Sequence, residues 1–309
     1  MTGRLVVLCP GQGAQHAAMF DMARTDPAAS RLLDRWFDDP VLAEPLRAAV
    51  DGPAGFANRV AQPSIVAATL AMWTALAETI PQPALVAGYS IGELSAHAVA
   101  GTLDATATVK LAAERARLMD ACVADGPPQA MVALSALPDG SASALLQRFG
   151  FYAAIVTGED TLVAGGPASE RDALAAAAIA AGGRATVLPV AVASHTPLLA
   201  GAVAPFAALL QEQPWQAPAF PVLAGISAEP VWDAQRAIDT LSRQVATPIR
   251  WHDCMDACIE AGATVALELG PGAALSRMLQ ARHPHIACRA VTEFRSLDGI
   301  RAWLDRQLA

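Results

Sequence analysis

The sequence predicts an α/β fold, in which a large domain with a mostly parallel β-sheet carries a small inserted α+β domain. Three observations lead to this prediction. Short apolar runs alternate with amphipathic stretches along the chain. A serine flanked by glycines joins one apolar run to a helical stretch. In the middle of the chain, about 60 residues follow the order β-α-β-β-α-β.

The first part of the chain, residues 1–126, is predicted to belong to the large domain. A buried strand is expected at 4–9, followed by a glycine-rich loop. Further expected elements are helices at 28–37 and 63–80, a strand at 83–88, and helices at 93–100 and 105–124. Residues 125–128, Asp-Gly-Pro-Pro, then break the chain.

The small domain is predicted at 127–192 and has a ferredoxin-like pattern. Its expected elements are strands at 130–134, 152–156, 162–164 and 185–190, and helices at 141–147 and 169–181. The chain then returns to the large domain, at 193–309. There we expect helices at 197–210, 233–245 and 252–261, strands at 222–226 and 264–268, and a helix that ends at 280.

Composition excludes several classes of function. The chain has 309 residues, of which 54% are hydrophobic, and a formal net charge of −8, which argues against nucleic-acid binding. No apolar run reaches the roughly 20 residues that span a bilayer. The five cysteines are scattered and odd in number, which argues against a metal site. We expect a cytoplasmic protein that binds neither membrane nor metal.

Residues 88–92, Gly-Tyr-Ser-Ile-Gly, have the context of a nucleophile elbow. The strand before them and the helix after them would place Ser90 on a sharp turn, as in an α/β-hydrolase-like domain. The flanking glycines give room where a Cβ would clash. The elbow predicts a nucleophilic serine, and the alternative is a plain tight turn between sheet and helix.

A serine hydroxyl needs a base to take its proton, and the chain offers six histidines. His195 follows the last predicted strand of the small domain, at a loop position where a scaffold can present a catalytic group. The other five fit surface or hydrogen-bonded histidines. His195 is therefore the predicted base.

Six motifs together resemble the malonyl-CoA:acyl carrier protein transacylase family. In chain order they are residues 10–15 (PGQGAQ), 88–93 (GYSIGE), 114–119 (ERARLM), 193–195 (ASH), 247–251 (TPIRW) and 268–272 (ELGPG). Their order and spacing are those of the family, over nearly the whole chain. Six ordered motifs are far more specific than any one of them.

The resemblance implies a ping-pong malonyltransferase. Ser90 would attack the thioester of malonyl-CoA and become the acyl-enzyme, and His195 would act as its general base. The backbone N–H groups of Gln12 and Ile91 would form the oxyanion hole. Arg115 would bind the free carboxylate of malonyl through two parallel hydrogen bonds.

Two of these roles leave alternatives open. A planar guanidinium suits a carboxylate, and the substrate would complete an otherwise unpaired buried Arg115. The other interpretation places Arg115 on a solvated helix face beside Glu114. The family orients its histidine through a backbone carbonyl, which the resemblance assigns to Arg250 here.

The branch within the family is indicated by Tyr89 in the elbow and by residues 293–299 (EFRSLDG). Both resemble the acyltransferase (epsilon) subunit of malonate decarboxylase. That resemblance implies an acyl carrier protein as partner, namely the carrier subunit with its phosphoribosyl-dephospho-coenzyme A arm. The enzyme itself would hold no cofactor, with malonyl-CoA as its substrate.

Other functions remain as alternatives. Malonyl loading for fatty-acid or polyketide synthesis would use the same residues. A serine esterase or thioesterase shares the elbow, but it needs water at the acyl-enzyme and has no use for a buried arginine. A protein that only docks a carrier would not need Ser90 and His195. A nucleotide site is not supported, because no lysine follows the glycine-rich loop as in a P-loop.

Overall fold

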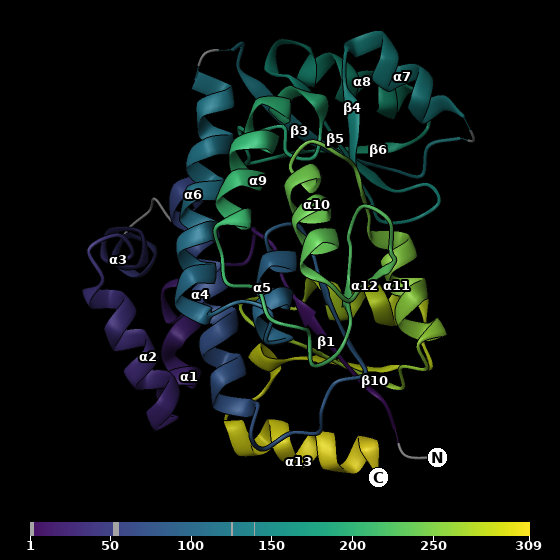
Figure 1. Ribbon diagram of the computed structural model, residues 1–309. Helices are drawn as coiled ribbons and strands as arrows, with labels where there is room; N and C mark the ends of the chain where they lie inside the picture. Colours follow the sequence, from purple (N-terminus) through teal and green to yellow (C-terminus); the bar gives the residue numbers. More distant parts are fainter. Residues whose placement is uncertain (1–2, 52–55, 125, 139) are drawn as a thin grey trace.

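Two β-sheets and the helices around them make up the computed structural model, which describes residues 3–51, 56–124, 126–138 and 140–309. Asp125, the first residue of the predicted chain break, lies outside the described residues. In Figure 1 the smaller sheet lies at the top with α7 and α8, and α13 lies at the bottom beside the C-terminus. The sequence prediction of an α/β fold is confirmed.

The larger sheet has six strands in the order β11-β10-β1-β2-β7-β8. Neighbouring strands are parallel except for the β7–β8 pair. The bounds are β1 Leu5–Cys9, β2 Leu85–Gly88, β7 Val222–Leu223, β8 Pro230–Val231, β10 Val265–Glu268 and β11 Ala287–Ala290. In the register, Cys9 pairs with Gly88 and Leu8 with Glu268. The loops that follow β1, β2 and β10 therefore meet at one edge of the sheet, where α/β folds place ligands.

Helices cover both faces of this sheet. They are α1 Asp21–Arg24, α2 Pro27–Asp38, α3 Ala43–Asp51, α4 Asn58–Leu76, α5 Gly92–Val99, α6 Ala105–Ala124, α9 Val203–Gln211, α10 Ala234–Gln244, α11 Trp251–Glu260, α12 Ala274–Arg282 and α13 Leu297–Leu308. The helix α4 is buried along most of its length and packs against α6, α2 and α3. Within the described ranges, no helix is both long and apolar enough to cross a bilayer.

The smaller sheet has five strands in the order β6-β3-β5-β4-β9. Its elements are β3 Gln129–Ser135, α7 Ser141–Phe149, β4 Tyr152–Val156, β5 Leu162–Pro167, α8 Arg171–Ala180 and β6 Arg184–Leu188. They follow the predicted β-α-β-β-α-β order. The pairs β3–β5, β3–β6 and β4–β5 are all antiparallel. The fifth strand, β9 Ile249–Arg250, comes from outside the predicted 127–192 segment and pairs parallel with β4.

Several expected bounds differ from the observed ones. The helix predicted to begin at Pro63 begins five residues earlier, at Asn58, so Pro63 lies inside α4. Proline has no N–H to donate to the carbonyl of Arg59, four residues earlier, and Arg59 is an exposed residue in the first turn of the helix. The strand predicted at 222–226 is only Val222–Leu223. The structure also has α3, α13 and β11, which the sequence analysis did not predict.

Candidate active site

Ser90 lies between β2 and α5 with a left-handed backbone, at a φ of 56°. Glycines permit this turn. A Cβ at Gly88 would collide with the backbone of Glu93, and a Cβ at Gly92 with the carbonyl oxygen of Cys9. A non-glycine residue in this region costs about 1–3 kcal/mol and persists where the surroundings hold it in place. The predicted elbow geometry is therefore present.

His195 lies opposite the elbow, in the loop between β6 and the 3-10 turn Pro197–Ala202. Its Nε2 is 2.7 Å from the Ser90 Oγ. The His195 backbone is also left-handed, at a φ of 63°, and its N–H donates to the carbonyl of Val245 at 2.9 Å. The smaller sheet fixes the start of this loop, because Gln129 Oε1 accepts the N–H of Ala193 at 2.8 Å. The structure thus brings together the two predicted catalytic side chains.

A backbone carbonyl orients the imidazole, but it belongs to Gln244 and not to Arg250. The Nδ1 of His195 donates to the Gln244 carbonyl at 2.6 Å, which leaves Nε2 free to accept the Ser90 proton. Gln244 is the last residue of α10, where carbonyls lack intrahelical partners. Arg250 lies in β9, with its N–H on the Gly225 carbonyl and its side chain 2.6 Å from Asp253. The Arg250 assignment is therefore wrong.

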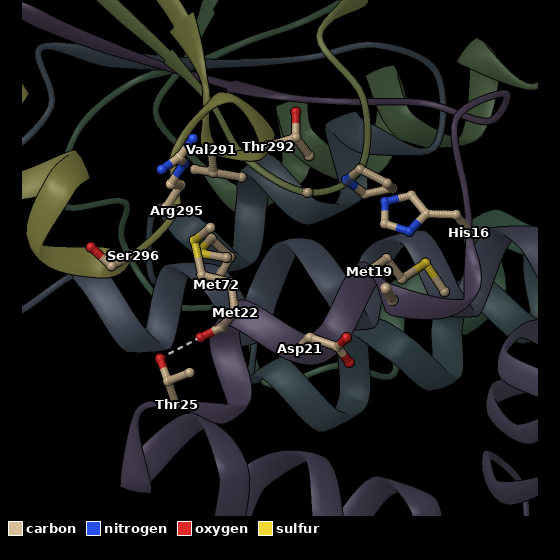
Figure 2. Close-up of a pocket in the computed structure, with 13 residues that line it drawn as sticks. His16, Met19, Asp21, Met22, Thr25, Met72, Val291, Thr292, Arg295 and Ser296 are labelled. Atoms are coloured by element: carbon tan, nitrogen blue, oxygen red, sulfur yellow. Dashed lines mark hydrogen bonds between the residues drawn. The ribbon is translucent and has the colours of Figure 1, made fainter.

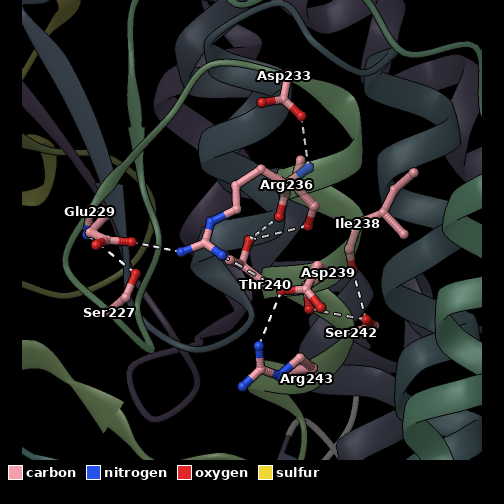
Figure 3. A network of polar contacts seen from close by, with 10 residues as sticks. Ser227, Glu229, Asp233, Arg236, Ile238, Asp239, Thr240, Ser242 and Arg243 are labelled. Atoms are coloured by element: carbon pink, nitrogen blue, oxygen red, sulfur yellow. Dashed lines mark hydrogen bonds and ion pairs between the residues drawn. The ribbon is translucent and has the colours of Figure 1, made fainter.

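The helix α10, which supplies Gln244, is held by polar contacts on its outer face (Figure 3). Asp233 caps its first turn by accepting the N–H of Arg236 at 2.8 Å. The Arg236 guanidinium in turn lies 2.6 Å from Glu229, in the loop that precedes the helix. These contacts fix the start of the helix whose last residue faces His195.

Arg115, on α6, is 2% exposed and does not lie on a solvated helix face. Its Nη1 donates to Gln62 Oε1 at 2.7 Å, and its Nη2 donates to Gln244 Oε1 at 3.0 Å. The neighbouring Arg117 is exposed and pairs with Glu114 instead. Among the described residues, no carboxylate forms an ion pair with Arg115. The guanidinium is thus buried among neutral oxygens.

Burial sets the protonation states around Ser90. It lowers the pKa of His195 to about 3, aided by the positive charge of Arg115 and opposed by the Gln244 carbonyl. Burial also raises the pKa of Glu93 to about 7, against hydrogen bonds from the Gly225 N–H and the Gln244 amide. The pKa of Arg115 is lowered by burial to about 10. At neutral pH, His195 is a neutral base and Arg115 is a cation.

The two predicted oxyanion-hole residues flank Ser90. Ile91 directly precedes α5, and Gln12 follows Gly11, whose added Cβ would lie 3.6 Å from the Ser90 Cβ. Within the described ranges, neither the Gln12 nor the Ile91 N–H donates a hydrogen bond. A cavity of about 260 Å³ opens beside Gln12. Its lining is completed by Gly13, Gln15, Phe56, Leu188, Pro189 and Val190.

A larger cavity, of about 580 Å³, lies between the start of the chain and its end (Figure 2). Three methionines, Met19, Met22 and Met72, give it an apolar lining, and His16 and Arg295 line it as well. Neither Ser90, His195 nor Arg115 lines this cavity. It is therefore separate from the site around Ser90.

The described part of the chain contains no set of side chains suited to bind a metal ion. No group of three or more histidine, cysteine and acidic side chains is arranged there to hold a metal ion. The five cysteines are free thiols, and four of them are buried.

Comparison with known proteins decides the family. The model of the acyl transferase domain family matches residues 6–285. The chain belongs to the acyl transferase domain family. The chain is therefore an acyltransferase, and the paired Ser90 and His195 are the candidates for its reacting groups.

Individual relatives cover nearly the whole chain. The malonyl CoA-acyl carrier protein transacylase of Mycobacterium tuberculosis is 31% identical over 300 residues, which is 95% of this chain and 98% of the relative. The crystal structure of MCAT from Mycobacterium tuberculosis has a TM-score of 0.89 at 29% identity, covering 99% of this chain and 100% of that one. A holo complex of a type II polyketide acyl-carrier protein with its malonyl-transacylase (PlMCAT:AntF) has a TM-score of 0.88 at 28% identity, covering 96% and 98%.

Sequence reasoning missed three buried residues of the acyltransferase site, namely Gln244, Gln62 and Glu93. Glu93 belongs to the elbow motif but received no role, although its place in the first turn of α5 was visible. Gln62 precedes Pro63 inside α4, and Gln244 precedes a predicted motif by three residues. No sequence pattern predicts that these side chains are 0–1% exposed, that Gln62 and Gln244 meet at Arg115, or that Glu93 contacts Gln244.

Proposed function

We propose that this acyltransferase moves malonyl from malonyl-CoA, through a Ser90 acyl-enzyme, to the thiol of an acyl carrier protein. The observation that carries the proposal is the buried Arg115. Its hydrogen-bond partners in the described part of the chain are neutral, and it shares one of them, Gln244, with His195. A buried cation without a counter-ion is costly unless a ligand completes it. A planar guanidinium pairs with a carboxylate through two parallel bonds, so malonyl fits this place.

The reaction follows from the hydrogen bonds at Ser90. His195 Nε2 takes the Oγ proton as Oγ attacks the thioester carbonyl, and the N–H groups of Gln12 and Ile91 receive the developing oxyanion. The collapsing intermediate releases the CoA thiolate, which takes the proton back from Nε2. A carrier thiol then gives its proton to Nε2 and attacks the acyl-serine. The second intermediate expels the Ser90 oxygen, which takes the proton from Nε2. The products are the malonyl-carrier thioester and free Ser90.

No carboxylate needs to assist His195 in this mechanism. The Gln244 carbonyl accepts a hydrogen bond from the Nδ1–H group. This bond fixes the tautomer and stabilises the imidazolium while it exists. Because the resting pKa of His195 is about 3, the imidazolium is short-lived and readily returns its proton to the leaving thiolate. The same hydrogen bond thus serves both half-reactions.

We also propose the finer assignments that the sequence suggested. The segment 127–192 would be a ferredoxin-like insert in a hydrolase-like domain (1–126 and 193–309) of a cytoplasmic enzyme. The carrier would be the carrier subunit of malonate decarboxylase, as Tyr89 and 293–299 indicate. In the structure these residues have structural contacts: Tyr89 packs edge-on against Trp251 at 5.2 Å, and Ser296 caps α13. The branch assignment therefore depends on the resemblance.

Malonyl loading of a fatty-acid or polyketide carrier is the second candidate. The named relatives favour it, because they are malonyl transacylases, one of them in complex with a type II polyketide acyl-carrier protein. The two candidates differ only in the carrier. Parallel assays with a phosphopantetheine carrier and with a carrier bearing the phosphoribosyl-dephospho arm would separate them, because the preferred carrier discharges the acyl-enzyme faster.

Intact-protein mass spectrometry after brief mixing with malonyl-CoA tests the transferase itself. We expect a malonyl adduct on Ser90 that carrier thiol discharges faster than water does. Acetyl-CoA, which lacks the free carboxylate, should acylate Ser90 more slowly. No adduct, or an adduct lost to water as fast as to carrier thiol, would favour the thioesterase or docking alternative instead.

A further inference from the structure

A continuous chain of hydrogen-bonded side chains passes through Arg115 and extends well beyond the reacting groups. The guanidinium donates to two amide oxygens, that of Gln62 on α4 and that of Gln244 on α10. An amide can present either its oxygen or its NH2 group, and only the oxygen suits a guanidinium, which has donors alone. The direction of both amides therefore decides how Arg115 is held.

The Gln62 amide is oriented by a pair of residues behind it, Asn58 and Asp120. Asn58 Nδ2 donates to the Asp120 Oδ1 at 2.9 Å and to the backbone carbonyl of Ala116 at 3.3 Å. Both partners accept, so the Asn58 oxygen must face the other way. There it accepts from Gln62 Nε2 at 2.5 Å, which turns the Gln62 oxygen toward Arg115.

The Gln244 amide is oriented in the same manner from the other end. Its Nε2 donates to the backbone carbonyl of Ser90 at 3.1 Å and to Glu93 Oε2 at 2.6 Å. Glu93 is anchored in turn by the N–H of Gly225, where an added Cβ would lie 2.8 Å from Oε2. The Gln244 oxygen is thereby left for Arg115.

Each end of this chain closes on a carboxyl group, yet neither carboxyl contacts the guanidinium. Glu93 is separated from Arg115 by one amide, and Asp120 is separated by two. The acidic groups can thus orient the amides without a direct ion pair to the cation, although the charge of Glu93 still raises the pKa of Arg115 from a distance. A direct ion pair at Arg115 would instead compete with an incoming carboxylate.

We propose that Asn58 and Asp120 are positioning residues that set the selectivity for acyl groups bearing a free carboxylate. They fix the Gln62 amide so that Arg115 keeps its orientation and its unneutralised charge. This inference rests on the proposed function of Arg115. Asn58, the first residue of α4, and Asp120, on the last turns of α6, have no hydrogen bond to Ser90 or His195.

Two variants test the inference, Asn58→Leu and Asp120→Asn. The rates of Ser90 acylation by malonyl-CoA and by acetyl-CoA are measured separately, together with Ser90 labelling by a fluorophosphonate. For Asn58→Leu, which frees the Gln62 amide, we expect the malonyl-to-acetyl ratio of kcat/KM to fall about tenfold. Asp120→Asn, which keeps the shape but loses the obligate acceptor, should lower the ratio less.

The adjacent Arg59 provides a matched control. It lies on the same turn of α4, is exposed, and among the described residues pairs only with Glu44, so Arg59→Gln should leave the ratio unchanged. Thermal unfolding checks that each variant folds, and if Asn58→Leu does not, Asp120→Asn decides.

An unchanged ratio in the folded variants would overturn the inference. An equal fall in malonyl, acetyl and fluorophosphonate reactivity would also overturn it, because that pattern reflects structural support alone. Failure of the proposed function gives a different result, namely no malonyl adduct in the wild-type protein.

Discussion

Replacing Arg115 with alanine removes a buried cation close to the Ser90–His195 pair. The side chain is 2% exposed, so water cannot take its place freely. The substitution also leaves the Gln62 and Gln244 amide oxygens without their donor. The variant therefore changes substrate binding and removes two buried hydrogen bonds at the same time.

The effect on malonyl transfer can be estimated from this burial. Leaving one member of a buried, hydrogen-bonded charge pair without its partner costs about 2–5 kcal/mol. Since about 1.4 kcal/mol corresponds to a factor of ten, kcat/KM for malonyl-CoA should fall about 30- to 4,000-fold. Acetyl-CoA has no free carboxylate, so the rate at which it acylates Ser90 should fall much less. The remaining fall would come from Gln244, which loses its bond to Arg115 and also orients His195.

The assay is acylation of Ser90 by each thioester, followed by quenched mixing and mass spectrometry. Arg115→Lys serves as the matched variant, because it keeps the charge but loses the planar fork. We expect its malonyl rate to lie between those of the wild type and Arg115→Ala. If malonyl and acetyl acylation fall by the same factor in Arg115→Ala, Arg115 is structural and the reasoning is refuted.

Three further predictions concern the reacting groups and their surroundings. Ser90→Ala should form no malonyl adduct, and label on any other residue would contradict the assignment of the nucleophile. Because the pKa of His195 is lowered to about 3, fluorophosphonate labelling of Ser90 should show no inflection near 6.5; such an inflection that persists in Glu93→Gln would contradict the buried state of His195. Because the folded pKa of Glu93 is raised from 4.5 to about 7, its stability contribution is full below pH 4.5 and is lost as the pH rises through 7. Glu93→Gln stays neutral and keeps an accepting oxygen, so it should match the wild type at pH 4 and exceed its free energy of unfolding by up to about 3 kcal/mol at pH 8; equal pH profiles in denaturant unfolding would disprove this.

Elements with a strong local pattern could be predicted from the sequence with nearly the observed bounds. The helix Ala105–Ala124 and the strand Tyr152–Val156 match residue for residue. Elements that depend on packing could not be predicted. The strand β9 is only Ile249–Arg250, and its extended pairing exists because β4 lies beside it. The helix α13 was missed because its first residues, within 293–299, were interpreted only as a family marker.

The site divides in the same way. The elbow is a local feature, because a strand, two glycines and a helix within a few residues leave one backbone path for Ser90. The orienting carbonyl is not local. The sequence motif indicated the carbonyl of Arg250. The carbonyl that accepts from His195 is that of Gln244, at the end of α10 and six residues before Arg250. Which of two nearby carbonyls is free depends on where a helix ends in space.

The sequence by itself determined the α/β class and the turn at Ser90, because these follow from short-range sterics and local patterns. Its ordered motifs named Ser90, His195 and Arg115 as candidate site residues. Only the tertiary structure decided what surrounds Arg115. Its two partners lie 53 and 129 residues away along the chain, on α4 and α10. Local pattern carries no information about which amides meet across such separations. The packing of α4, α6 and α10 determines which amides meet Arg115, because it excludes water and leaves each buried donor a single set of acceptors.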